Sequence, residues 1–180
     1  MAIMNRALRG LARQPVSRSI GSIRPFSSTF ALHDTIPFHV DGQGTGVAQT
    51  VGVKDTIRTI NTDAYPAFGG KNEYPSPLHF NLTALSSCTQ VTGSIVAKDH
   101  GINLKDWKVS VTGQLDPAVL VGGAEGNANW TSINLDVEVA TDADGAKFDK
   151  WTSEVERRCP VTQLFKRSGA EWTSKWVNKA

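Results

Sequence analysis

Residues 76–101 read SPLHFNLTALSSCTQVTGSIVAKDHG and contain the start, the body and the end of one long helix. Ser76 can accept a hydrogen bond from the first turn, and Pro77 suits the first helical position, where its missing N–H needs no partner. Gly101 suits the position just after a helix end. The pattern predicts a helix of about 23 residues, about 35 Å long, that runs through the middle of the fold.

One face of this helix is apolar and is predicted to be buried. Its residues recur at intervals of three and four, and small side chains nearby allow close approach by another element. Cys88 lies on this face, where a free cysteine ordinarily acts as a small apolar side chain. The predicted stripe consists of Leu78, Leu82, Leu85, Cys88, Val91 and Ile95.

Alternating apolar residues ahead of the helix predict three short strands. The first covers residues 36–40 and lies at a sheet edge, because Pro37 has no N–H to donate to a neighbour. Turn residues over 41–46 connect it to a second strand over 47–53, so that the two form a hairpin. A third strand covers residues 55–61.

The second half of the chain contains two longer strands, a second helix and a closing strand. Strands, helix, strands, helix and strand form an α+β order and not a βαβ repeat. In chain order the predicted segments are a strand over 107–115, a flexible connection over 121–127, a strand over 133–139, a helix over 146–158, a short helix from Pro160 through Phe165, and a strand with Trp172 and Trp176.

Composition excludes several classes of protein. With 180 residues, 39% apolar and 20% charged, the chain can bury a core and is neither disordered throughout nor a disulfide scaffold. No uninterrupted apolar run is long enough for a membrane-spanning helix, and the net charge of +2 argues against a nucleic-acid partner. Scattered histidines and the lack of a nucleotide-binding motif predict no metal and no cofactor.

The first 33 residues differ in composition from the rest. They contain five arginines and several serines but no acidic residue, which is typical of a mitochondrial transit peptide. We therefore expect a mitochondrial protein, in the matrix, cleaved near His33, with one domain over residues 34–180. While attached, residues 1–33 are expected to be extended or poorly packed. The alternative is a disordered basic tail that binds nothing.

Thiol chemistry remains the one candidate chemistry in the sequence, and each cysteine also fits a packing role. Cys159 extends the apolar face of the second helix, which favours packing. It also precedes Pro160 at a helix start and follows Arg157 and Arg158, and both features stabilise a thiolate. The residues alone leave both readings open for Cys88 and Cys159.

Two blocks around the cysteines resemble the osmotically inducible protein C / organic hydroperoxide resistance (OsmC/Ohr) family. The first block runs from Phe68-Gly69-Gly70 through Pro75-Ser76-Pro77-Leu78 to Leu82-Thr83-Ala84-Leu85-Ser86-Ser87-Cys88-Thr89. The second is Cys159-Pro160-Val161-Thr162-Gln163-Leu164. The likeness spans residues 35–178, and it implies an α+β fold with antiparallel sheets around a long central helix, in an intertwined homodimer.

The resemblance implies a peroxidase without metal or flavin. Cys88 would attack an organic or lipid hydroperoxide and become a sulfenic acid, and Cys159 would resolve it as an intramolecular disulfide. A dithiol, in relatives often a lipoylated protein, would reduce the disulfide, and the matrix holds such proteins. Phe68, Phe80 and Leu82 would line an apolar substrate pocket, unless they are ordinary core.

The chain departs from the family at two charged positions. Leu78 and His79 stand where family peroxidases have a glutamate, and the turn over 41–46 lacks their arginine. His79 is the candidate polar replacement and Arg58, on the third strand, the candidate charge. Because a buried thiol without a cation has a raised pKa, the alternative function is a non-catalytic OsmC-like module that binds a small apolar ligand.

Overall fold

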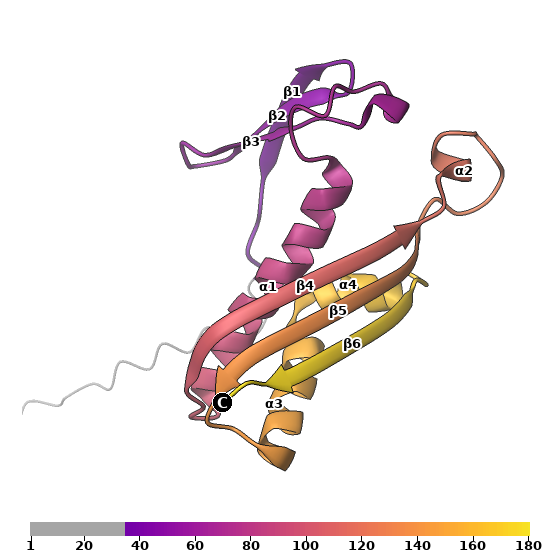
Figure 1. Ribbon diagram of the computed structural model, residues 1–180. Helices are drawn as coiled ribbons and strands as arrows, with labels where there is room; N and C mark the ends of the chain where they lie inside the picture. The colour runs from indigo at the N-terminus through magenta and orange to yellow at the C-terminus, as the bar shows by residue number, and fades with distance from the viewer. Residues whose placement is uncertain (1–34) are drawn as a thin grey trace, which may run out of the picture. The chain divides into compact units, whose positions relative to one another are not determined.

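The computed structural model describes residues 35–180, so the transit peptide predicted over residues 1–33 lies outside the described residues. Two three-stranded sheets and a long helix confirm the predicted α+β class (Figure 1). A compact unit spans Phe38–Ala180. In chain order its elements are β1 (Val40–Thr45), β2 (Ala48–Val53), β3 (Thr59–Thr62), the 3-10 turn η1 (Pro66–Phe68), α1 (Pro77–Asp99), β4 (Leu104–Leu115), α2 (Pro117–Leu120), β5 (Trp130–Thr141), α3 (Gly145–Arg158), α4 (Pro160–Arg167) and β6 (Glu171–Asn178).

The first hairpin exists, but its strand and turn are shifted from their predicted places. The segment predicted as the turn, residues 41–46, mostly forms β1, and residues 36–39 have no strand structure. The turn is shorter because Thr45 pairs directly with Ala48, and Gly46 takes a left-handed φ of 65°. Gly44 instead allows the two strands of the hairpin to approach each other closely, since a Cβ there would lie 2.1 Å from the Ala48 carbonyl oxygen.

The third strand is also shorter than predicted. It pairs antiparallel with β2 over Thr59–Thr62, while residues 54–57 form a turn in which the Thr56 hydroxyl donates to the Val53 carbonyl. All residues of β1 are exposed, and only the end of β3 is buried. Within the described chain, other elements therefore cover almost none of this small sheet.

The long helix forms as the sequence predicts. α1 has 23 residues, and the Ser76 side chain accepts a hydrogen bond from the His79 amide at its start. Gly101 follows its end with a left-handed φ of 59°, which a residue without Cβ adopts freely. Start, length and end are thus confirmed.

The buried face of α1 differs from the predicted stripe. Of the predicted residues, Leu85 is fully buried, whereas Val91 is 59% exposed and Ile95 is 49% exposed. The face that packs against the rest of the chain uses smaller and more polar side chains, because β4, α3 and α4 approach it closely. It consists of Leu85, Thr89, Thr92, Gly93, Val96 and Ala97.

The larger sheet has the order β4–β5–β6 and is mixed. β4 and β5 are antiparallel, as expected, but β6 runs parallel to β5. A parallel neighbour requires a crossover, and α3 with α4 provides it, so this part of the chain contains one βαβ unit. The predicted helix over 146–158 and the restart at Pro160 are confirmed by α3 and α4.

Helices cover one face of this sheet and bury its apolar side chains (Figure 1). Trp151 of α3 is fully buried, and its indole N–H donates to the Gly93 carbonyl at 3.1 Å. Trp107 and Trp176 meet its ring edge-on. A Cβ on Gly93 would lie 2.5 Å from Trp107, so glycine there permits this contact.

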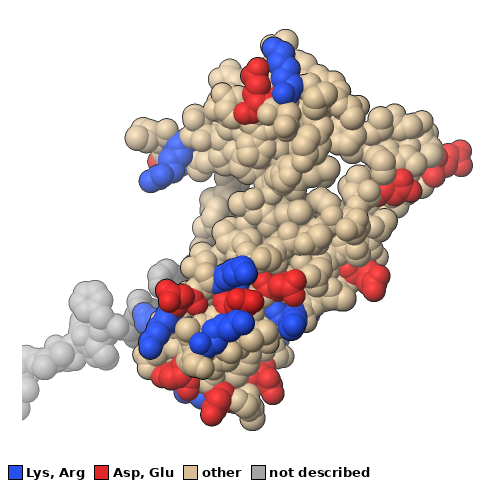
Figure 2. Space-filling view, in the orientation of Figure 1, with Lys and Arg blue, Asp and Glu red and all other residues tan. Residues whose placement is uncertain are grey.

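The opposite face of the same sheet is polar. In β5, buried Val137 alternates with Asp136 and Glu138, which point away from the helices. Figure 2 shows charged side chains gathered over the lower part of this sheet, whereas the surface over β1–β3 is mostly uncharged. Among residues 35–180, no helix is both long and apolar enough to cross a membrane.

Candidate thiol site

The fold brings the two cysteines together. Cys88 lies in the middle of α1, and Cys159 lies at the junction between α3 and α4, both of which pack on α1. Their thiols lie close enough for each to shift the pKa of the other, and both are free. The packing of α4 on α1 thus creates a thiol pair from residues far apart in the sequence.

Cys159 is fixed by the start of α4. A residue before proline is restricted to extended backbone, and Cys159 accordingly has φ −73° and ψ 113°. This conformation ends α3 and turns the sulfur toward the first turn of α4, where the Thr162 amide donates to Sγ at 3.4 Å. The side chain is fully buried. Cys159 is therefore an N-cap whose acceptor is a sulfur.

Cys88 is more accessible and has fewer donors. It is half-buried, and its Sγ lies 4.0 Å from the hydroxyl oxygen of Thr92, one helical turn further along α1. The backbone N–H of Val161 in α4 lies near it and acts to lower its pKa. The first turn of α4 thus presents one amide to each sulfur.

The environments of the two thiols separate their pKa values. Burial raises the pKa of the Cys88 thiol, and the adjacent Cys159 sulfur raises it further. Burial also opposes ionisation of Cys159, but hydrogen bonds from Thr162, Cys88 and Thr92 outweigh it and lower the pKa of this thiol. The first negative charge on the pair therefore lies on Cys159, at a helix N-terminus, and Cys88 keeps its proton.

Such a pair can move a proton and form a bond. Because the pKa of Cys159 is lowered and that of Cys88 is raised, Cys159 is suited to accept the Cys88 proton when Cys88 acts as a nucleophile. Because the two thiols lie close together, oxidation of either can be followed by disulfide formation. No lysine or arginine among residues 35–180 donates a hydrogen bond to either sulfur.

Neither candidate replacement for the family's charged residues contacts the thiols in this chain. The His79 ring is held between the Ser76 hydroxyl, at 2.9 Å, and the Tyr65 hydroxyl, at 3.1 Å. Arg58 is exposed and lies just before β3 rather than on it. Within the described residues, amide and hydroxyl donors surround the sulfurs where the sequence suggested a cation.

The three predicted pocket residues are all half-buried, but they lie in different surroundings. Leu82 packs against the core around Leu85 and Phe165, as ordinary core would. Phe68 lies in η1, with its ring edge-on to Tyr65. Phe80 lies in the first turns of α1. None of them lines the hollow described below.

Sequence reasoning missed the polar partners of the sulfurs. These are the Thr92 hydroxyl, the Val161 amide and the amide of Thr162. Two signals were present: Thr92 follows Cys88 by four positions, which places both on one helix face, and Thr162 stands three positions after the N-cap Cys159. Only the packing of α4 on α1 shows that these partners serve one site.

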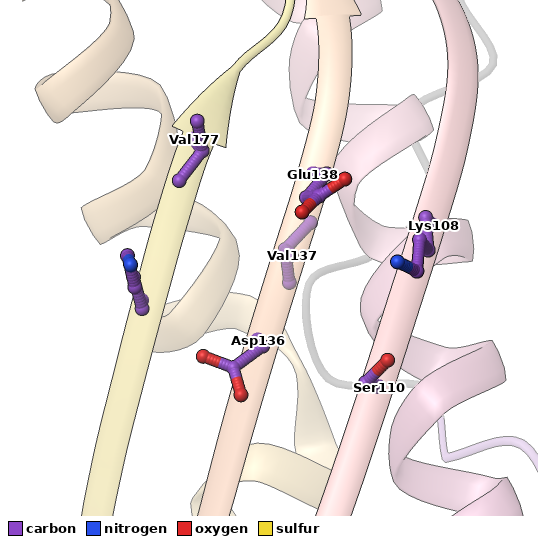
Figure 3. A pocket seen from close by; sticks show the side chains of 7 residues that line it. Lys108, Ser110, Asp136, Val137, Glu138 and Val177 are labelled. Carbon is purple, nitrogen blue, oxygen red and sulfur yellow. The ribbon is translucent and has the colours of Figure 1, made fainter.

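A hollow of about 330 Å³ lies on the polar face of the larger sheet (Figure 3). Lys108, Ser110, Asp136 and Glu138 stand around it, with opposite charges paired across neighbouring strands: Lys108 faces Glu138, and Asp136 faces Lys175. These pairs give a solvated face with little net charge. No group of three metal-binding side chains is gathered within residues 35–180.

Both the sequence and the structure of this chain are similar to those of known proteins. The sequence profile of the family described as OsmC-like protein matches residues 70–175, which is more than half of the chain. That range includes both cysteines. No curated protein matches.

Solved structures share the fold at low sequence identity. An OsmC-like protein from Mycoplasma pneumoniae superposes with a TM-score of 0.64 at 19% identity, covering 79% of this chain and 99% of the other. An organic hydroperoxide resistance protein from Elizabethkingia anophelis gives 0.64 at 14%, covering 82% and 100%. One from Legionella pneumophila gives 0.60 at 12%, covering 79% and 98%.

Proposed function

Because the chain belongs to the OsmC-like protein family, we propose that it reduces organic hydroperoxides with its two thiols. The observation that carries the proposal is that the packing of α3 and α4 on α1 places Cys88 and Cys159 close enough to shift each other's pKa, one accessible and one buried. Two of the similar structures are named organic hydroperoxide resistance proteins, which supports the same substrate class. No metal or flavin is required.

The reaction balances with these two residues. The Cys88 sulfur attacks the outer oxygen of the hydroperoxide while its proton passes to the Cys159 thiolate, and the O–O bond breaks. The leaving alkoxide takes that proton and departs as an alcohol, so that Cys88 becomes a sulfenic acid. The Cys159 thiolate then attacks the Cys88 sulfur, and the hydroxide that leaves takes a proton from the solvent and becomes water. Two thiols are oxidised to one disulfide.

Neutral donors take the place of the missing cation in this scheme. Amides at the start of a helix carry partial positive charge, and they stabilise an anion without a formal charge of their own. Here the Thr162 amide faces Cys159 and the Val161 amide faces Cys88. Developing negative charge on either sulfur therefore meets an N–H from α4.

An external dithiol would return the disulfide to two thiols. We propose a lipoylated protein as this donor, because the Arg-rich and acid-free residues 1–33 indicate a mitochondrial matrix address, where such proteins occur. The dithiol must reach the sulfur that is accessible, and Cys88 is the more exposed of the two. Reduction would therefore begin at Cys88.

We also propose that the working unit is a homodimer. The hairpin of the small sheet exposes Val40 at 59% in β1 and Val47 at 43% in the turn, and α1 exposes Val91 at 59%. Several large apolar side chains exposed in this way favour a surface that a partner covers. A second copy of the chain, as the family resemblance implies, would cover them.

Mass spectrometry of the intact protein tests the proposed activity. One equivalent of cumene hydroperoxide should convert the reduced protein into a form lighter by two hydrogen atoms, because the disulfide forms within one chain. Cys88→Ser should stay unoxidised. Cys159→Ser should stop at the sulfenic acid, which dimedone traps.

The two serine variants serve as matched controls for each other. Equal turnover of hydroperoxide by both variants and the parent would overturn the proposal. The raised pKa of Cys88 favours the alternative, a non-catalytic module that binds a small apolar ligand. That alternative predicts slow alkylation of Cys88 at neutral pH and no disulfide after peroxide.

A further inference from the structure

The buried hydroxyl of Thr92 is used differently from three neighbouring hydroxyls of α1. Ser87, Thr89 and Ser94 each donate back to the carbonyl four residues earlier, at 2.9, 2.8 and 2.9 Å. This back-bonding is the usual arrangement for hydroxyl side chains inside helices. Thr92 instead contacts sulfur, with its hydroxyl oxygen 4.0 Å from Cys88 Sγ.

Thr92 also reaches the second sulfur. It is 7% exposed, and its hydroxyl helps to lower the pKa of Cys159 as well as that of Cys88. A buried hydroxyl that gives up its own backbone carbonyl needs another partner. Among the described residues, that hydrogen-bond partner is the Cys88 sulfur.

We propose that Thr92 is a positioning residue that holds the Cys88 sulfur toward Cys159. The geometry of this inference comes from the contacts of the Thr92 hydroxyl. Its importance for catalysis rests on the proposed function. Cys88 is half-buried and otherwise held by one amide. The hydroxyl restricts where its sulfur points, so that the pair stays within bonding range.

The role has two measurable consequences. Without the hydroxyl, the Cys88 sulfur samples other rotamers, and formation of the disulfide slows because the reactive arrangement is populated less. Without the hydroxyl, a thiolate on either sulfur also loses one donor, so the alkylation of the pair shifts to higher pH. Burial and chain fold stay the same, since valine has nearly the shape of threonine.

The experiment compares Thr92→Val, Thr92→Ala and Thr92→Ser with Thr89→Val as the matched control. Thr89 is 1% exposed on the same helix, and its hydroxyl bonds only to the Leu85 carbonyl. Disulfide formation is driven by diamide, which oxidises paired thiols without a sulfenic acid step, and in parallel by cumene hydroperoxide. The pH profile of iodoacetamide alkylation is measured on the same proteins.

We expect Thr92→Val and Thr92→Ala to form the disulfide about five- to tenfold more slowly with diamide and to shift the alkylation midpoint up by about one pH unit, as loss of one hydrogen bond predicts. Thr92→Ser and Thr89→Val should match the parent. Unchanged rates and midpoint in Thr92→Val and Thr92→Ala would overturn the inference, as would an equal effect of Thr89→Val.

Failure of the proposed function is distinguishable. In that case diamide still reports the positioning effect, whereas peroxide gives no disulfide even in the parent. Circular dichroism and thermal unfolding verify that each variant is folded. A Thr92→Val protein that does not fold leaves Thr92→Ala to decide, since the smaller side chain cannot overpack the site.

Discussion

The two sheets of this protein have three strands each and very different surroundings. β4–β5–β6 carries helices on one face, and four side chains of β5 alone are at most 1% exposed: Ile133, Leu135, Val137 and Val139. β1–β3 has no comparable cover in the described chain, and every residue of β1 is exposed. Apolar strand residues contribute to stability only where a second layer removes them from water.

The contrast extends to the thiol site. Both cysteines belong to the covered region, where α1, α3 and α4 pack on one another. Rigid packing of these helices keeps the two sulfurs close together. This matters because a change of about one ångström in the separation of two reacting groups changes their reactivity strongly. Arg58, by comparison, stands at the exposed end of the small sheet, without an ion pair in the described residues.

Trp151 gives the largest expected effect, because it is the centre of the covered region. Trp151→Ala removes a fully buried indole, its hydrogen bond to Gly93 and its contacts with Trp107 and Trp176. The free energy of unfolding should fall by about 3–5 kcal/mol. Denaturant titration measures it, and a loss below about 1 kcal/mol would contradict the assignment of the core.

Substitution of Glu156, at the edge of the same covered region, should have the second-largest effect on the free energy of unfolding. Its carboxylate accepts from Lys166 at 2.6 Å and from the Trp176 indole at 2.9 Å. Burial opposes its ionisation, but these bonds and one from Ser174 hold the pKa of Glu156 below its usual value. Glu156→Gln should lower the free energy of unfolding by about 1 kcal/mol, since Lys166 and the partly buried Trp176 indole lose a charged acceptor.

The pH dependence of this loss has a definite sign. Since the pKa is lower in the folded state, ionised Glu156 stabilises the fold fully above the unfolded carboxyl pKa of about 4.3, and the contribution disappears as the pH falls through the folded value. The difference between parent and variant should be constant above about pH 6 and shrink in acid. Glu138→Gln is the control: its pair with Lys179, at 3.7 Å and about half exposed, should matter by less than about 0.5 kcal/mol.

Substitution in the small sheet should have the smallest effect on stability, and it tests the contrast between the two sheets directly. If a second copy covers it, unfolding depends on protein concentration, and each tenfold dilution lowers the apparent stability by about 1.4 kcal/mol. Val40→Asp, on exposed β1, should give a monomer whose unfolding is independent of concentration. A parent protein with one midpoint over a hundredfold range of concentration would refute the dimer; light scattering provides an independent measure.

Local sequence signals predicted most elements correctly. Ser76, Pro77 and Gly101 marked the ends of α1, and the spacing of Phe148, Trp151 and Val155 marked the buried face of α3. The first hairpin was displaced because Asp and Gly residues over 41–46 were interpreted as a turn, whereas Gly44 is needed where two strands approach closely. Composition cannot distinguish those two uses of glycine.

The buried face of α1 could not be predicted for a related reason. Val91 and Ile95 are more apolar than Thr89 and Thr92, yet the threonines are buried in this chain. Which side of an amphipathic helix faces inward depends on what packs there, and β4, α3 and α4 approach on the small-residue side. The parallel pairing of β6 depends likewise on the crossover formed by two helices.

By itself the sequence determined the α+β class, the long helix and the two candidate thiols, because capping, periodicity and residue type are local properties. The tertiary structure alone decided that the two thiols lie close together, that hydrogen bonds lower the pKa of the buried one, and that the Thr92 hydroxyl contacts the Cys88 sulfur. These depend on the docking of α4 against α1, a long-range contact that no local pattern encodes.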